Sequence, residues 1–139
     1  MAVTFTTETK GFKLTERTAL KAWIQRIAAD HKKKCGNIHY VFVSDDRLLQ
    51  MNIEFLDHST YTDIITFDYS EGEVIHGDIF ISTDRVKDNA HKFKSEFKDE
   101  LHRVMIHGVL HLCGFKDKSK KDAEMMRREE NRSLRKRPF

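Results

Sequence analysis

The alternation of strand-like and helix-like segments along the chain constrains its fold more than any other feature. Runs rich in β-branched and aromatic residues predict strands at residues 3–7, 37–44, 62–69 and 78–83, with a loop or hairpin turn at 70–77. Apolar residues that recur at helical spacing predict helices at residues 16–34, 46–56, 83–93, 95–114 and 120–137. Because helices of varied length separate the strands, we expect an α+β fold in which a small mixed four-stranded sheet is packed by about five helices.

Composition indicates a single soluble domain spanning residues 1–139. Hydrophobic residues make up 39% and charged residues 34% of the chain, Pro138 is the only proline, and no repeat or linker-like tract divides the sequence. No apolar run approaches the roughly 20 residues needed to span a bilayer, and no signal peptide is visible, so we expect no membrane partner. Cys35 and Cys113 form no C-x-x-C motif, which fits a reducing, cytoplasmic location. We also expect no nucleotide cofactor.

Several residues are candidates for the ends of the helices. Thr15 is expected to cap the first helix, with lysines in its last turn and Gly36 as the stop. Ser44 or Asp45 is expected to cap the second helix, and Ser95 the helix at 95–114.

Two histidines in the most apolar predicted helix, at residues 95–114, are the strongest candidates for chemistry. His107 and His111 are four residues apart, so their side chains project from one helix face, as two ligands of one metal ion would. Gly114 suits the left-handed position that ends a helix, and the chain can then bring Asp117 back to the histidines. A His-His-Asp set leaves one position for water, as in catalytic sites. We therefore predict a metal site on this central buried helix and the loop after it.

A simpler interpretation is that both histidines are hydrogen-bonded core or surface residues. In a chain with eight histidines, an H-x-x-x-H pair is a weak signal on its own. Cys113 is the rival ligand, but it lies about 200° around the helix from His111 and should point away.

The residue after the first histidine bears on the reaction. Zinc peptidases of the H-E-x-x-H type use a glutamate there as general base, whereas this chain has Gly108, which disfavours peptide hydrolysis. A metal ion could still polarise a phosphoryl oxygen and activate water for phosphodiester cleavage. No general base is identifiable, so metal-bound water is the expected nucleophile.

Three ordered sequence blocks resemble one known family. "HGVLHLCGFKD", residues 107–117, resembles the signature of the YbeY family of bacterial metal-dependent endoribonucleases. Residues 51–67 and 76–82 are similar to two further blocks of that family, so the resemblance covers most of the chain.

The resemblance implies a fold, an activity and a cofactor. The fold is a small mixed sheet packed by several helices, with one bound divalent metal ion, usually zinc. The activity is single-strand-specific RNA cleavage in maturation of the 3′ end of small-subunit ribosomal RNA and in ribosome quality control. The implied partners are ribosomal precursor RNA and the small ribosomal subunit. His107 and His111 match the first two ligand histidines of the family, and Asp117 falls at the third.

The chain departs from the family pattern at three positions. Asp117 replaces a histidine and Lys116 an aspartate, so the predicted ligand set is harder and more anionic than three imidazoles. Leu56 occupies the place of an arginine, so the charge that would hold a phosphate must come from elsewhere. His58 and Lys116 are candidates by position, and His58 is also a candidate for catalysis.

Other polar residues have weaker functional interpretations. Asp63 could orient a ligand histidine and is a candidate catalytic residue, but it could equally be a capping carboxylate. Asp78 is expected at a turn and strand entry, and Glu100 as an exposed helix carboxylate more than as a partner of His107. Four methionines are expected to pack in the core: Met51, Met105, Met125 and Met126.

Basic residues cluster at 32–34 and in the C-terminal segment, within a net charge of +3. They suit contact with an RNA backbone, and Arg127 and Arg128 are candidates for substrate binding, although a solvated helix face explains the charges as well. Two further hypotheses stay open: a metallopeptidase-like metal hydrolase, and a non-enzymatic ribosome-assembly factor with a structural metal.

Overall fold

The computed structural model describes residues 2–56 and 61–139, which form one four-stranded sheet and five helices. The strands are β1 (Val3–Thr7), β2 (Lys34–Val43), β3 (Ile64–Asp68) and β4 (Val74–Ser82), in the order β1-β2-β4-β3. β2 pairs in parallel with β1 and β4, whereas β3 is antiparallel to β4. The sheet is therefore mixed, as the sequence predicts.

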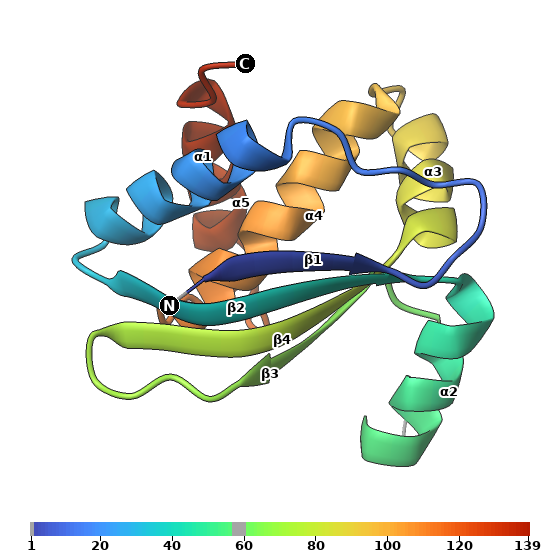
Figure 1. Cartoon of the computed structure of the whole chain (residues 1–139), viewed down its shortest axis with the longest axis horizontal. Helices are drawn as coiled ribbons and strands as arrows, with labels where there is room; N and C mark the ends of the chain where they lie inside the picture. The colour runs from blue at the N-terminus through green and yellow to red at the C-terminus, as the bar shows by residue number, and fades with distance from the viewer. Residues whose placement is uncertain (1, 57–60) are drawn as a thin grey trace.

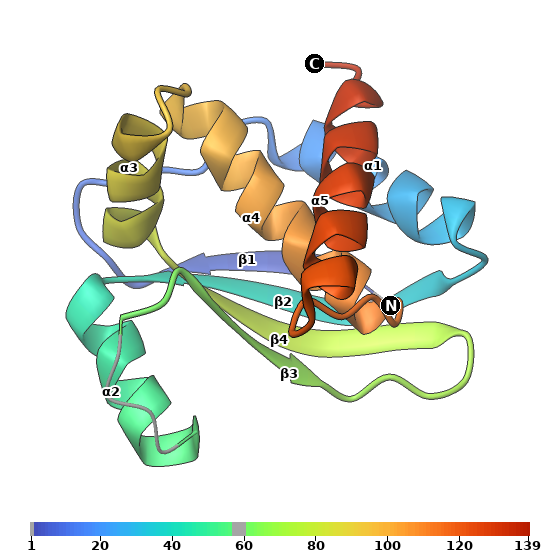
Figure 2. The same ribbon diagram turned by 180° about the vertical axis from the view of Figure 1, so that it is seen from behind.

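Four helices cover one face of the sheet, and the fifth lies on the other side (Figure 1). The helices are α1 (Arg17–Asp30), α2 (Asp45–Leu56), α3 (Thr83–Lys92), α4 (Phe97–Leu112) and α5 (Lys120–Arg135). α2 is the helix on the opposite side, and α4 lies between α3 and α5 (Figure 2). No helix within the described ranges is both long enough and apolar enough to cross a bilayer.

The main core forms where α4 crosses the sheet. Met105 and Val109 are fully buried, and the Tyr40 hydroxyl donates a hydrogen bond to the Met105 carbonyl at 2.9 Å. Gly108 lies directly against β4, since a Cβ atom there would be 2.9 Å from Cδ1 of Ile79. Zinc peptidases have a glutamate at the position of Gly108. Here the glycine has a packing role, because it lets α4 approach the sheet closely.

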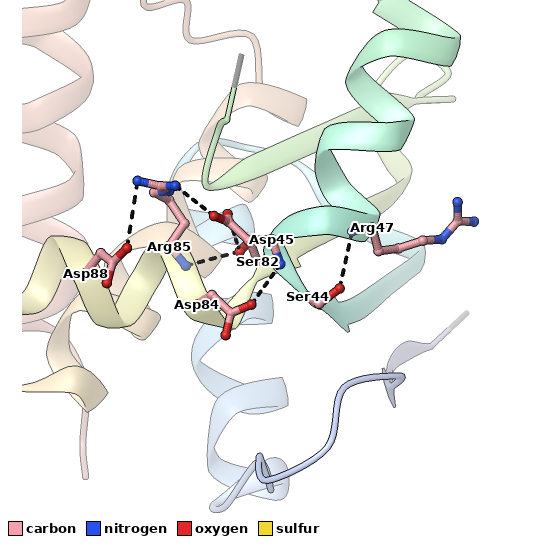
Figure 3. Close-up of polar contacts among 7 residues, drawn as sticks. All are labelled: Ser44, Asp45, Arg47, Ser82, Asp84, Arg85 and Asp88. Carbon is pink, nitrogen blue, oxygen red and sulfur yellow. Dashed lines mark hydrogen bonds and ion pairs between the residues drawn. The ribbon is translucent and has the colours of Figure 1, made fainter. Parts of the chain in front are cut away.

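A second, smaller core lies between α2 and the opposite face of the sheet. It contains five buried residues: Val41, Val43, Leu48, Met51 and Ile65. A polar junction fixes the first turn of α2 to the start of α3 (Figure 3), where Asp45 accepts hydrogen bonds from Ser82 at 3.0 Å and from Arg85 at 2.7 Å. Asp84 accepts from the backbone N–H of Asp45 at 2.9 Å (Figure 3). α2 is therefore anchored where β2 and β4 both end.

Two predicted strand boundaries were wrong. β4 begins at Val74 rather than at residue 78, because Tyr69 and His76 already pair across a short turn and Glu71 bridges to Val74. β2 begins at Lys34, and Gly36 lies inside it rather than ending a helix. A Cβ atom at Gly36 would lie 2.1 Å from the imidazole ring of His76, so this glycine leaves room for that ring, whose Nδ1 accepts the N–H of Asn37 at 3.0 Å.

The expected helix ends were partly wrong. α1 ends at Asp30, before the lysines, because Lys32 adopts a left-handed backbone conformation. The residues preceding α1 and α4 are Glu16 and Glu96, not Thr15 and Ser95, and neither gives a side-chain cap. The expectation for Ser44 was confirmed, since its hydroxyl accepts the N–H of Arg47 at 3.2 Å (Figure 3).

Candidate active site

A pocket of about 480 Å³ opens beside α4. Its walls come from β3 and the residues before it, from α3, from α4 and from α5, so segments distant in sequence meet there. The polar side chains that line it include the three predicted metal ligands: His107, His111 and Asp117.

His107 lies between two carboxylates. Its Nδ1 atom is 2.7 Å from Oε2 of Glu130, and its Nε2 atom is 3.3 Å from Oδ2 of Asp117. A carboxylate only accepts hydrogen bonds, so the short contact to Glu130 places a proton on Nδ1. Burial disfavours the charged ring, but the hydrogen bond and charge of Glu130, with Asp117, raise the pKa of His107 above its ordinary value.

The chain returns to His107 through a turn at the end of α4. Gly114 has φ 108°, its N–H bonds to the His111 carbonyl at 3.0 Å, and the N–H of Phe115 bonds to the Leu110 carbonyl at 3.1 Å. This pair of bonds is a Schellman motif, in which the left-handed residue reverses the chain. It brings Asp117 to the pocket, where His111 is exposed one turn after His107.

Glu130 and Arg103 line the pocket and were not predicted from the sequence. Glu130 lies on α5 with only 5% of its surface exposed, and Arg103 donates a hydrogen bond to it at 3.0 Å. Burial alone would raise the pKa of Glu130, but its bonds to His107 and Arg103 hold that pKa below the usual value. One signal was available, because Glu130 shares its helix face with buried Met126 and Ser133. A carboxylate at a core-facing position needs a partner.

Two further carboxylates line the pocket. Glu100 is 6% exposed, so its expected exposure was wrong; its pKa is raised, chiefly by burial. Burial also raises the pKa of Asp63, although the nearby charge of His107 opposes the shift. The pocket thus gathers acidic groups around His107 and His111, with Arg103 and Arg127 as its cationic lining.

Among the described residues, the other predicted site residues differ in whether they line this pocket. Lys116 and Arg128 are exposed and do not line this pocket, whereas Arg127 does, 3.6 Å from Glu130. His58 lies outside the described residues. Asp78 does not lie at a strand entry but inside β4, paired with Phe67.

Two expectations about sulfur-containing residues had different outcomes. Met125 is exposed and not in the core, because it lies on the outer face of α5. Cys113 is half-buried and packs against the main core rather than lining the pocket. Burial raises the pKa of its thiol to about 11, so it is a poor candidate for a metal ligand.

The residues at the pocket can be tested against the needs of a metal ion. Within residues 2–56 and 61–139, no three His, Cys, Asp or Glu side chains lie close enough to form a ready metal-binding group. The Nε2 atom of His107 and Oδ2 of Asp117 are nevertheless 3.3 Å apart, which is the separation of two ligands each about 2.0–2.1 Å from a tetrahedral ion. His111 lines the same pocket with an exposed side chain that can change rotamer. Two imidazoles and one carboxylate could therefore hold such an ion.

The pocket combines contacts between a histidine and carboxylates with perturbed pKa values. On an α+β fold, these features indicate a small enzyme with a histidine–carboxylate site. The family model described as endoribonuclease YbeY matches residues 4–137. The chain belongs to this endoribonuclease family.

Individual relatives agree with this assignment. A protein of Cytophaga hutchinsonii named endoribonuclease YbeY is 53% identical over 136 residues, covering 97% of this chain and 95% of the relative. The endoribonuclease YbeY of Parabacteroides distasonis is 46% identical over 134 residues, covering 96% and 94%. The solution structure of TM1509 from Thermotoga maritima has a TM-score of 0.69 and 29% identity, covering 96% of this chain and 87% of that one.

Proposed function

We propose that this protein is a metal-dependent endoribonuclease that cleaves single-stranded RNA during maturation of ribosomal RNA, at the 3′ end of the small-subunit RNA, and in ribosome quality control. The observation that supports it best is the fixed position of His107 between Glu130 and Asp117, in a polar pocket of a protein from an endoribonuclease family. Ribosomal precursor RNA and the small ribosomal subunit are the proposed partners, and the cytoplasm is the proposed location.

His107, His111 and Asp117 would hold one divalent ion, for which we propose zinc. Zinc accepts both imidazole nitrogen and carboxylate oxygen and tolerates a three-ligand site with an open position. A bound ion would supply Lewis-acid chemistry, polarising a phosphoryl oxygen and lowering the pKa of a water molecule.

Glu130 prepares His107 for this role. By accepting the proton of Nδ1, its carboxylate leaves the lone pair of Nε2 directed toward Asp117 and the pocket. Glu130 is held in turn by Arg103, so the ring, the carboxylate and the guanidinium form one chain of charge-assisted hydrogen bonds. This arrangement fixes the tautomer and the orientation of the ring before substrate arrives.

Cationic side chains in the pocket can bind the substrate phosphate in place of the arginine that is absent at position 56. Leu56 ends α2, is exposed and does not line the pocket, whereas Arg103 and Arg127 do. The Arg127 side chain is 56% exposed and so can reach an incoming strand. We propose that Arg127 contacts the substrate phosphate and that Arg103 mainly holds Glu130. Lys116 and Arg128, outside this pocket, would contribute to RNA affinity at longer range.

The direct test is cleavage of a single-stranded RNA by the purified protein, with chelator, with zinc restored, and by the variant His111→Ala. We expect cleavage that chelator abolishes, zinc restores and His111→Ala lacks. His91→Ala is the matched control, because His91 is exposed on α3 and does not line the pocket. Cleavage unaffected by chelator would overturn the proposal.

Neither alternative function gains support from the structure. The peptidase base would fall at Gly108, which is buried against Ile79 and does not line the pocket. A purely structural metal would leave the exposed, polar pocket without a use, and under that hypothesis chelation should unfold the protein rather than only silence it.

A further inference from the structure

One exposed aromatic side chain lies on the wall of the polar pocket. Phe93, at the end of α3, is 55% exposed and lines the same pocket as His107 and Arg127. Tyr69, which is 57% exposed, does not line it. An exposed apolar ring in a pocket of charged groups indicates a ligand that has an apolar face.

The position of Phe93 is fixed by the way α3 ends. Its N–H bonds to the Asn89 carbonyl at 2.9 Å, and Ser95 N–H bonds back to the Ala90 carbonyl at 2.9 Å. Lys94 occupies the left-handed position between them with φ 55°, where glycine is usual. A lysine there is strained relative to a glycine, and the two hydrogen bonds hold the backbone of Phe93 at the end of α3.

The charges around the ring indicate the kind of ligand. The Lys92 ammonium lies 5.6 Å from the Phe93 ring centroid, and Arg127 lines the same pocket. A ligand that suits both features has a flat apolar face and a phosphate close to it. Nucleobases of an unpaired RNA strand have both, whereas bases in a duplex already stack on their neighbours.

We propose that Phe93 is a stacking platform for a nucleobase beside the cleaved phosphate, and that it makes the pocket select unpaired RNA. This inference rests on the proposed function and adds to it a residue that determines substrate class. Asn89 lies one turn earlier on α3 and also lines the pocket, so a base on Phe93 would pass close to its side chain. Because every base has an apolar face, the contact favours single strands without choosing a sequence.

The test is binding of a single-stranded RNA made resistant to cleavage by 2′-O-methyl groups and carrying the fluorescent base 2-aminopurine. We expect Phe93→Ala to weaken binding by about 5- to 100-fold, and Phe93→Trp to retain it together with the fluorescence quenching of a stacked base. Tyr69→Ala, the control of equal exposure, should bind as the wild type does. Binding of the same sequence as a duplex should be weak and indifferent to Phe93.

The outcomes separate this inference from the proposed function. If Phe93→Ala binds the single strand as tightly as the wild type, or if the wild type does not bind it, the inference is wrong even when unmodified RNA is cleaved. If binding depends on Phe93 and Phe93→Trp restores it, the inference stands even when no RNA is cleaved, and the proposed function then fails alone. Thermal unfolding of each variant checks that the exposed substitution leaves the fold unchanged.

Discussion

Two of the three histidines of α4, five residues apart, lie in regions of the molecule with opposite effects on their pKa values. His102 is 2% exposed and its Nδ1 atom lies 2.8 Å from the guanidinium of Arg137. An arginine only donates, so Nδ1 of His102 accepts and carries no proton, and burial together with Arg137 lowers its pKa to about 4. His107 meets the carboxylate of Glu130 at the same atom, and its pKa is raised.

The difference shows that the partner, rather than the helix, decides what a buried histidine does. Residues five apart on a helix point about 140° away from each other, so the two rings face different surroundings. His102 packs against Trp23 and Phe139 in a buried aromatic cluster, where a neutral ring is favoured. His107 faces acidic groups and an open pocket, where an oriented nitrogen is available for chemistry.

Replacing each of these two histidines with alanine should give the largest difference in cleavage rate between the two regions. We expect His107→Ala to slow RNA cleavage by more than about a hundredfold, beyond the range that residues around metal ligands usually show. His102→Ala should leave the cleavage rate of the folded protein within a few-fold of wild type. Single-turnover rates on one RNA measure both, and equal losses in the two variants would contradict the division of roles.

Removing the charge that orients His107 should have the next largest effect. Glu130→Gln can still contact Arg103, but it does not supply the anionic acceptor for Nδ1, and we expect a 10- to 100-fold loss of activity and of metal affinity. Glu124→Gln, an exposed residue of the same helix, is the control. Unchanged metal affinity in Glu130→Gln would show that the contact is incidental.

The neutral histidine predicts a pH dependence of stability. Unfolded His102 gains a proton near pH 6.5, whereas the folded residue gains one only near pH 4. Its contribution is therefore constant above pH 6.5, is lost as the pH falls from 6.5 to 4, and amounts to on the order of 3 kcal/mol. Urea denaturation at pH 7.5 and pH 4.5 should show His102→Gln losing less stability than the wild type. An identical loss in both proteins would mean that His102 does not have this low pKa.

The smallest expected effect on stability comes from the ion pair between Lys136, next to Arg137, and Asp30. Lys136 lies 2.7 Å from Asp30 at the surface. Lys136→Met should change the free energy of unfolding by less than about 1 kcal/mol, because solvent screens the pair.

The same substitution should leave the low pKa of His102 unchanged in an NMR titration, whereas Arg137→Met should raise that pKa. A low pKa retained in Arg137→Met would assign the shift to burial alone.

The sequence allowed α4, its histidine pair and the turn at Gly114 to be predicted, because each depends on local spacing. The start of β4 could not be predicted, since Gly77 reads as a turn residue. In the structure Gly77 stays inside the strand, where a Cβ atom would lie 2.8 Å from the Phe67 carbonyl oxygen. This close approach depends on the neighbouring strand, so the sequence around Gly77 contains no local pattern that predicts it.

The partner of His107 could not be predicted for a similar reason. Glu130 is 23 residues away, and only the packing of α5 against α4 brings the two side chains together. The charged neighbours of Glu130 on α5 gave that segment the appearance of a solvated helix. Glu100 looked like a surface residue because its burial depends on the helices that surround it.

Whether His107, His111 and Asp117 hold a metal ion can be measured by isothermal titration of zinc into the metal-free protein at pH 7.5. The wild type would be compared with His111→Ala, Glu130→Gln and His102→Gln. We expect one site per chain in the wild type and in His102→Gln, weaker binding in Glu130→Gln, and no binding in His111→Ala. Equal zinc binding by His111→Ala and the wild type, or no binding by the folded wild-type protein, would contradict this expectation.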